Sequence, residues 1–171
     1  EVGMLPCPPI AAAVTYVGRQ LALNTKRLCE LQPGVHCVYG DTDSVFLRLE
    51  GEYDILRASA RADELASMVN KVIPPPNKLE FEKVYLPLIL GGKKRYAGMK
   101  YEEGRQPASL DVKGYEIVRR DNFPLLNSTM RKMVEHILNN DVEGGEHVAR
   151  NAVSDILTTP SHQLDLEQLT I

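Results

Sequence analysis

The chain has 171 residues, 43% of them hydrophobic and 25% charged, which is enough for one domain of ordinary size or two small ones with a real core. The net charge of −3 excludes a uniformly basic surface, so any nucleic-acid site has to be a local patch. No run of about 18 apolar residues occurs, which argues against a membrane span or a membrane partner. The three cysteines lack the spacing of a zinc motif, and we expect free buried thiols. Because the first residue is Glu1, we expect a piece of a longer protein.

The first half of the chain is predicted to alternate helices and strands. Pro8-Pro9 suits a first helical turn, and the apolar residues that follow at helical spacing predict one buried stripe. Pro33-Gly34 ends this helix, and three consecutive prolines from Pro74 end a second one. The predicted elements are a helix over 8–30, strands over 35–39 and 44–49 joined by a hairpin turn at 40–43, and a helix over 53–73.

The second half begins with further strands and ends in helices. Gly91-Gly92 predicts a turn between two of the strands, and Gly144-Gly145 predicts a loop between the last two helices. The composition becomes mainly helical near residue 120, where we expect a domain boundary. The predicted elements are strands over 79–85, 88–90, 93–101 and 111–118, a polar loop over 102–109, and helices over 125–138 and 146–157.

Two acidic residues occupy the first predicted hairpin turn. In an extended segment residues i and i+2 point the same way, so Asp41 and Asp43 are expected to share a face. Two like charges ~4 Å apart repel by about 4 kcal/mol at an effective dielectric of about 20, a cost that a cation removes. Oxygen ligands at this density suit Mg²⁺, which binds one or two carboxylates together with substrate phosphates. The alternative is a solvated aspartate-rich turn. An EF-hand loop is excluded because Val45 and Phe46 stand where a ligand and a glycine are required.

A second acidic pair, Glu80 and Glu82, lies in a predicted strand, on the face opposite Leu79 and Phe81. An exposed strand face explains this alternation. The functional alternative is a face that turns toward the aspartates and adds negative charge beside a metal.

Basic residues follow the Gly91-Gly92 turn. Strand alternation would put Lys94 and Tyr96 on one face and Lys93 and Arg95 on the other. A solvated hairpin tip is one explanation. The other is a DNA contact, since a lysine in the minor groove can donate to acceptors that every base pair presents.

Five segments resemble the family B DNA polymerases, in that family's order. "YGDTDS" (39–44) resembles the third polymerase motif, and "KKRY" (93–96) resembles the motif at the primer duplex. "KLEFEKVYLPLIL" (78–90) and "KGYEIVRRDNFPLL" (113–126) are similar to the delta-type branch. "GMLPCPPIAAAVTYVGRQ" (3–20) resembles the helix after the fingers, as in delta-type enzymes of large DNA viruses.

The resemblance implies an α+β fold, with an antiparallel palm sheet backed by helices and followed by the helical start of the thumb. Residues 1–120 would be the C-terminal part of the palm and 121–171 the beginning of the thumb. The implied activity is template-directed addition of deoxynucleoside triphosphates to a primer 3′ end, by phosphoryl transfer with two Mg²⁺ ions.

The resemblance also implies roles for individual residues. Asp43 would ligate the metals directly and Asp41 would shape the charge of the site, so both are candidate catalytic and metal residues. Glu82 and Glu80 would be supporting acids. Residues that support the motif would be Tyr39, Gly40, Thr42 and Ser44. Candidate DNA contacts are Lys93, Lys94 at the minor groove, Arg95, Tyr96 at the primer strand, and Arg119 and Arg120 at backbone phosphates.

The implied partners are primer–template DNA, deoxynucleoside triphosphates and, for the parent protein, a sliding clamp or other processivity factor. Action in the nucleus of a cell or host, or in a viral replication compartment, is expected. The motif with the other metal-binding aspartate and the motif that holds the triphosphate do not occur, so we expect the 171 residues alone to be inactive. Two rival hypotheses are a nucleotide cyclase on a similar palm and a non-catalytic DNA-binding remnant.

Overall fold

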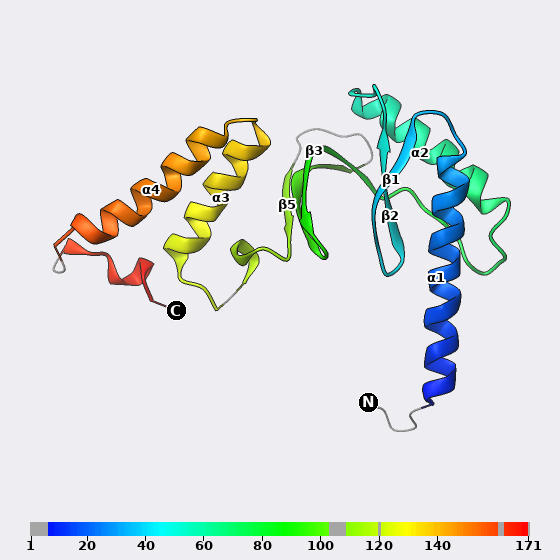
Figure 1. Ribbon diagram of the computed structural model, residues 1–171, viewed down its shortest axis with the longest axis horizontal. Helices are drawn as coiled ribbons and strands as arrows, with labels where there is room; N and C mark the ends of the chain where they lie inside the picture. The colour runs from blue at the N-terminus through cyan, green and yellow to red at the C-terminus, as the bar shows by residue number, and fades with distance from the viewer. Residues whose placement is uncertain (1–6, 103–108, 120, 161–162, 171) are drawn as a thin grey trace. The chain divides into compact units, whose positions relative to one another are not determined.

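A computed structural model describes residues 7–102, 109–119, 121–160 and 163–170 (Figure 1). The chain divides into two compact units, residues 1–84 and 85–171, and each is described by itself. The elements are α1 (Pro8–Glu30), β1 (Val35–Asp41), β2 (Ser44–Leu49), α2 (Ile55–Asn70), β3 (Lys83–Gly92), β4 (Arg95–Glu102), β5 (Ser109–Lys113), η1 (Glu116–Val118), α3 (Pro124–Leu138), α4 (Val142–Thr158) and η3 (Leu166–Gln168). Two antiparallel sheets with helices confirm the predicted α+β class.

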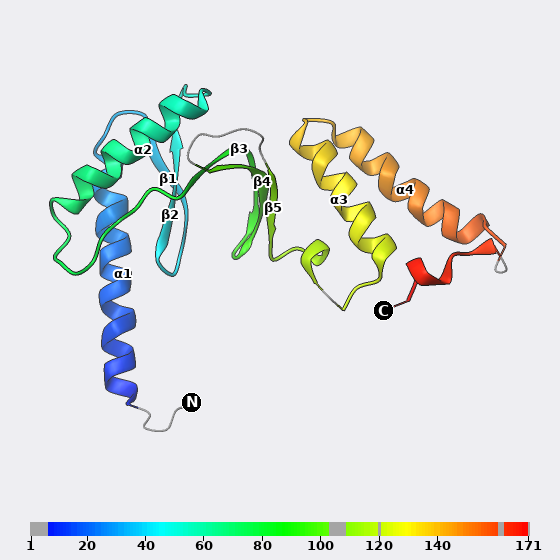
Figure 2. The ribbon, with the colours of Figure 1, turned by 180° about the vertical axis from the view of Figure 1, so that it is seen from behind.

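The first unit is built around the β1–β2 hairpin. The two strands pair antiparallel from Val35 opposite Leu49 to Asp41 opposite Ser44, with an irregularity at Val38. Helices α1 and α2 lie beside the hairpin (Figures 1 and 2). Side chains from both helices and from β1 form the core: Cys29, Val35, Leu65 and Val69. This core fixes the base of the hairpin and leaves its turn at the far end.

Helix α1 differs from its prediction in burial. The expected buried stripe is exposed in the first half of the helix, where Ile10, Val14 and Val17 are 65%, 66% and 51% exposed. Only toward the C-terminal end do Thr25 and Cys29 become buried. The helical spacing was correct, but among the described residues of this unit the core contacts lie at one end of the helix.

The second unit contains a three-stranded sheet in the order β3-β4-β5, seen most clearly from behind (Figure 2). Strand β4 pairs antiparallel with β5, so that Tyr96 is opposite Lys113 and Gly98 is opposite Asp111. One face of the sheet is covered by η1 and α3, and the core residues on it are Ala97, Val112 and Ile117, packed against Met130 and Val134. Because side chains alternate along a strand, the residues on either side of Ala97 and Val112 belong to the other face.

Three predicted boundaries in the strands are wrong. Residues 79–82 precede the sheet, and a single strand, β3, replaces the two strands expected over 79–85 and 88–90. The strand expected over 111–118 ends at Lys113. Gly114, with φ of +69°, turns the chain there, and η1 follows.

The loop predicted around Gly144-Gly145 is also wrong, because both glycines lie within α4. The helix begins earlier because the carboxylate of Asp141 accepts a hydrogen bond from the Gly144 amide at 2.8 Å and caps it. A Cβ at Gly145 would lie 3.3 Å from the carbonyl oxygen of Met133, so this glycine lets α4 approach α3 closely. Two glycines in sequence here serve helix packing rather than a turn.

Two predictions about the whole chain have mixed outcomes. Within the described ranges, no helix combines the length and the apolar character needed to cross a membrane. All three thiols are free, but only Cys29 is buried, whereas Cys37 is half-buried and Cys7 is exposed. Burial raises the pKa of the Cys29 thiol, and nearby Cys37 and Glu30 raise it further, so this thiol is poorly reactive.

Candidate functional site

The acidic turn, residues 41–44, closes the β1–β2 hairpin. Asp41 is the last residue of β1 and pairs with Ser44, so the turn proper consists of Thr42 and Asp43. Thr42 has φ of +36°, a conformation that β-branched residues rarely adopt. The hydroxyl groups of Thr42 and Ser44 donate to the Asp41 carboxylate and to its backbone carbonyl, both at 3.2 Å. Asp41 is therefore the hydrogen-bonded anchor of the turn.

The two aspartates differ in exposure. Asp43 is exposed at the tip, and Asp41 is half-buried at the end of the strand. The simple strand alternation predicted for the pair does not apply, because Asp43 belongs to the turn and not to β1. Behind the turn, Tyr39 and Phe46 stack edge to face across the two strands with ring centroids 5.3 Å apart. This aromatic pair stiffens the hairpin below the carboxylates.

The donor set of this turn fits part of a magnesium site. Carboxylate oxygens are the ligands that Mg²⁺ prefers, and one or two of them suffice when substrate phosphates and waters complete the octahedron. Across the part of the chain that the structure describes, no three His, Cys, Asp or Glu side chains gather into a metal site. Asp43 and Asp41 are the residues that would hold the ion. Its other ligands would be groups outside this turn, such as substrate phosphates and waters.

The supporting acids Glu80 and Glu82 are not on a strand face as predicted. Both are exposed in the segment before β3, and each forms an ion pair with a nearby lysine: Glu80 with Lys78 at 2.9 Å and Glu82 with Lys83 at 2.8 Å. The hydrogen bond and charge of Lys78 lower the pKa of Glu80. Each glutamate is thus paired with a lysine of its own segment.

The basic turn, Lys93 and Lys94, closes the hairpin between β3 and β4. Lys94 has φ of +59°, the left-handed region. The predicted alternation of faces fails here because both lysines lie in the turn, while Arg95 and Tyr96 open β4. Lys93, Lys94 and Arg95 are exposed.

Tyr96 belongs to a polar group on the face of the sheet that is opposite the core. The Tyr85 hydroxyl on β3 donates to the Asp111 carboxylate on β5 at 2.5 Å, and the rings of Tyr85 and Tyr96 meet edge to face, 6.0 Å apart. Lys113 approaches the same carboxylate at 3.5 Å. Burial raises the pKa of Tyr85 far above its ordinary value, and the Asp111 carboxylate raises it further, so the hydroxyl stays protonated as a donor.

The sequence indicated no role for Tyr85, Asp111, Gly114 or Tyr115. Gly114 and Tyr115 contact the β3–β4 hairpin, and Asp111 accepts a hydrogen bond from Tyr85, a residue of that hairpin. A signal was present only for Gly114, since a glycine inside a predicted strand indicates an irregularity or a close approach of another backbone segment. The contact between Tyr85 and Asp111 joins residues 26 positions apart, and no local pattern indicates it.

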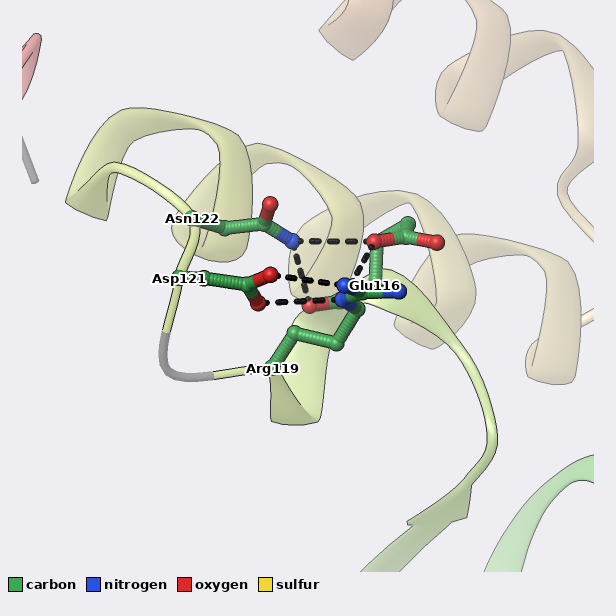
Figure 3. A network of polar contacts seen from close by, with 4 residues as sticks. All are labelled: Glu116, Arg119, Asp121 and Asn122. Atoms are coloured by element: carbon green, nitrogen blue, oxygen red, sulfur yellow. Dashed lines mark hydrogen bonds and ion pairs between the residues drawn. The ribbon is translucent and has the colours of Figure 1, made fainter.

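Arg119, predicted to contact DNA phosphates, is held by carboxylates (Figure 3). Its guanidinium donates two hydrogen bonds to Asp121, at 3.0 and 2.6 Å, and lies 3.4 Å from Glu116. Asn122 donates to the carbonyl and to the carboxylate of the same Glu116. The hydrogen bonds from Arg119 lower the pKa of Asp121 to about 2. The neighbouring Arg120 lies outside the described residues.

The sequence as a whole matches one family along its entire length. Residues 1–171 match the model of DNA polymerase family B. The chain belongs to DNA polymerase family B. Its family B relatives include the DNA polymerase delta catalytic subunit of Mesocricetus auratus, 40% identical over 100% of this chain, and that of Schizosaccharomyces pombe, 38% identical over 99%. A DNA polymerase of Paramecium bursaria Chlorella virus NY2A is 43% identical over 80% of this chain.

These family B relatives are much longer than the chain. The 171 residues span 16% of the hamster and fission yeast proteins and 15% of the viral one. The predicted family and its delta-type branch are confirmed, and the match gives no support to a nucleotide cyclase.

Proposed function

We propose that these residues are part of a DNA-directed DNA polymerase of the delta type. They would supply part of its metal site and part of its DNA-binding surface. The family match and the named delta catalytic subunits support this assignment. Within the molecule, the observation that carries it is the β1–β2 turn, where exposed Asp43 follows the anchored Asp41. The proposal concerns the longer protein, because the chain spans only a sixth of these relatives.

In the proposed reaction, the 3′-hydroxyl oxygen of a primer attacks the α-phosphorus of a deoxynucleoside triphosphate. A phosphorus–oxygen bond forms while the bond to the bridging oxygen on the β side breaks, so that pyrophosphate leaves and the hydroxyl proton passes to solvent. Two Mg²⁺ ions, when bound, would neutralise the charge on the attacking and leaving oxygens. Asp43 would be a direct ligand of these ions. Asp41 would hold the turn through its hydrogen bonds with Thr42 and Ser44 and add negative charge.

The basic hairpin would contact the product duplex. Its exposed lysines can donate to base-edge acceptors in the minor groove or to phosphates, and neither contact selects a sequence. Lys94 is assigned to the minor groove and Tyr96 to the primer strand, with Lys93 and Arg95 beside them. Arg119 would have to exchange Asp121 for a phosphate. A processivity factor and action at sites of replication, in the nucleus or a viral compartment, complete the proposal.

The experiment is Asp43→Ala in the full-length polymerase, with Asp63→Ala as the control. Asp63 is an exposed acid on α2, so the control removes the same charge elsewhere in the same unit. Primer extension should be lost in Asp43→Ala and retained in Asp63→Ala, with primer–template binding unchanged in both. Full extension by Asp43→Ala would refute the metal-ligand role.

A second measurement addresses the remaining rival, a non-catalytic DNA-binding remnant. Under the proposal, the unaltered full-length protein extends a primer, whereas the isolated 171-residue chain does not, because its described residues provide too few metal ligands. Binding of DNA without extension by the full-length protein would favour the remnant, and extension by the isolated chain would contradict the proposal.

A further inference from the structure

The turn of the basic hairpin is in contact with the chain that follows β5. Gly114 packs against the backbone of Lys94: a Cβ at this position would overlap the Lys94 carbonyl oxygen and lie 3.0 Å from its carbonyl carbon. The hydroxyl of Tyr115 fills the space beside Gly91, where a Cβ would overlap it. Two consecutive residues that follow β5 therefore contact the turn at Lys94 and the end of β3 at Gly91.

A second contact reaches the hairpin across the sheet. The Tyr85 ring on β3 passes over Gly98 on β4, because a Cβ at Gly98 would lie 2.9 Å from a ring carbon of Tyr85. Gly98 is opposite Asp111 in the β4–β5 register, so the Tyr85 hydroxyl can cross the middle strand and donate to Asp111. Tyr96, two residues before Gly98, lies on the same face and meets the Tyr85 ring.

These contacts converge on the residues that the proposed function assigns to DNA. Lys94 is in the left-handed region, which a lysine rarely occupies without support from its surroundings. Only glycine fits at position 114, because the backbone there has φ of +69° and any Cβ would overlap the Lys94 carbonyl oxygen. Asp111, with a side chain 12% exposed, has its carboxylate engaged by Tyr85 and Lys113 rather than directed into solvent.

We propose that residues 111–115 are a positioning element for the basic hairpin. Asp111 orients Tyr96 through the Tyr85 hydroxyl and ring, and Gly114 and Tyr115 set the backbone of the Lys93–Lys94 turn. Tyr85, Asp111 and Gly114 are positioning residues and touch no substrate themselves. The inference rests on the proposed function, since it requires that Lys94 and Tyr96 contact the primer duplex.

The test uses the full-length polymerase with Tyr85→Phe and Gly114→Ala. Tyr85→Phe keeps the ring and removes only the hydroxyl that donates to Asp111. Gly114→Ala introduces a Cβ against Lys94, and its matched control is Gly51→Ala, which has φ of +72° but no atom within 4 Å of the added Cβ. Lys94→Ala reports whether the hairpin contacts DNA at all. The measurements are the primer–template Kd, the KM for the triphosphate and kcat at saturating DNA.

We expect both positioning variants to raise the primer–template Kd about tenfold while the KM for the triphosphate stays unchanged, because a displaced contact loses binding geometry. Gly51→Ala should leave the Kd unchanged. A purely structural defect would lower the active fraction without moving the Kd, and that result would overturn the inference. If Lys94→Ala raises the Kd but Tyr85→Phe does not, the positioning role is wrong and the proposed function stands. If Lys94→Ala has no effect either, the DNA assignment itself fails, and the inference fails with it.

Discussion

The acidic and the basic hairpin have the same local design but different support. Each closes with a two-residue turn that contains a non-glycine residue at positive φ, Thr42 in one and Lys94 in the other. In the acidic turn, the hydroxyls of Thr42 and Ser44 donate within the turn itself. The basic turn packs against Gly114, which follows β5. The difference fits the proposed tasks: a metal ligand is fixed by the ion that it binds, whereas a contact with a duplex depends on prior positioning.

The largest expected effect distinguishes the two aspartates of the acidic turn. In the full-length enzyme, Asp43→Asn should lower the rate of extension by roughly 10³-fold, because several kcal/mol of charge stabilisation are lost with a direct ligand. Asp41→Asn should lower the rate of extension only about tenfold, since the amide oxygen of the asparagine can still accept the hydrogen bond from Thr42. Single-turnover extension measures both. Equal losses would show that the two carboxylates ligate the metal alike.

The two hairpins should differ in how much stability they lose when a glycine in a strand is replaced by alanine. Gly98→Ala should destabilise the second unit by about 1–3 kcal/mol, because its Cβ would lie 2.8 Å from the Pro87 carbonyl oxygen in a packed sheet. Gly40→Ala in the acidic hairpin meets only the Ser44 carbonyl oxygen at 3.4 Å, and we expect a change within about 0.5 kcal/mol. Urea unfolding of the 171-residue chain provides the values. A larger loss of unfolding free energy for Gly40→Ala than for Gly98→Ala would contradict this prediction.

A smaller effect is expected from releasing Arg119. Asp121→Asn removes the carboxylate that holds the guanidinium, so DNA binding should become roughly threefold tighter at low salt and unchanged at high salt. Glu143→Gln removes the same charge from an exposed position on α4 and serves as the control. Equal tightening in both variants would mean that net charge alone, and not Arg119, is responsible.

The smallest effect concerns acid stability. The pKa of Asp121 is about 2 in the folded chain because of Arg119, against an ordinary value of 3.8. A lowered pKa stabilises the fold above the ordinary value, and this stabilisation is lost as the pH falls from about 4 to about 2. The Tm of Asp121→Asn should therefore decline less over this interval than that of the unaltered chain. Parallel declines would show that the pair contributes nothing to stability.

The sequence predicted the helices and both hairpins because their signals are local: apolar spacing, proline boundaries and turn residues. The turn predicted at Gly91-Gly92 is wrong by two residues, since both glycines end β3 and Lys93 and Lys94 form the turn. It failed where distant residues decide the outcome. The exposed first half of α1 depends on which residues cover it, and the link from Tyr85 to Asp111 depends on strand register. The motif residues 41–44 and 93–96 were found through their resemblance to a family, whereas strand alternation does not apply to Asp43 and Lys94, because both lie in turns.

The most direct test of the account measures the single-turnover extension rate and the primer–template Kd for Asp43→Ala and Lys94→Ala in the same full-length enzyme. Asp43→Ala should lose the extension rate and keep the Kd, whereas Lys94→Ala should raise the Kd about tenfold and keep most of the rate at saturating DNA. If both variants changed the same quantity, or if Asp43→Ala extended primers normally, the division of tasks between the two hairpins would be contradicted.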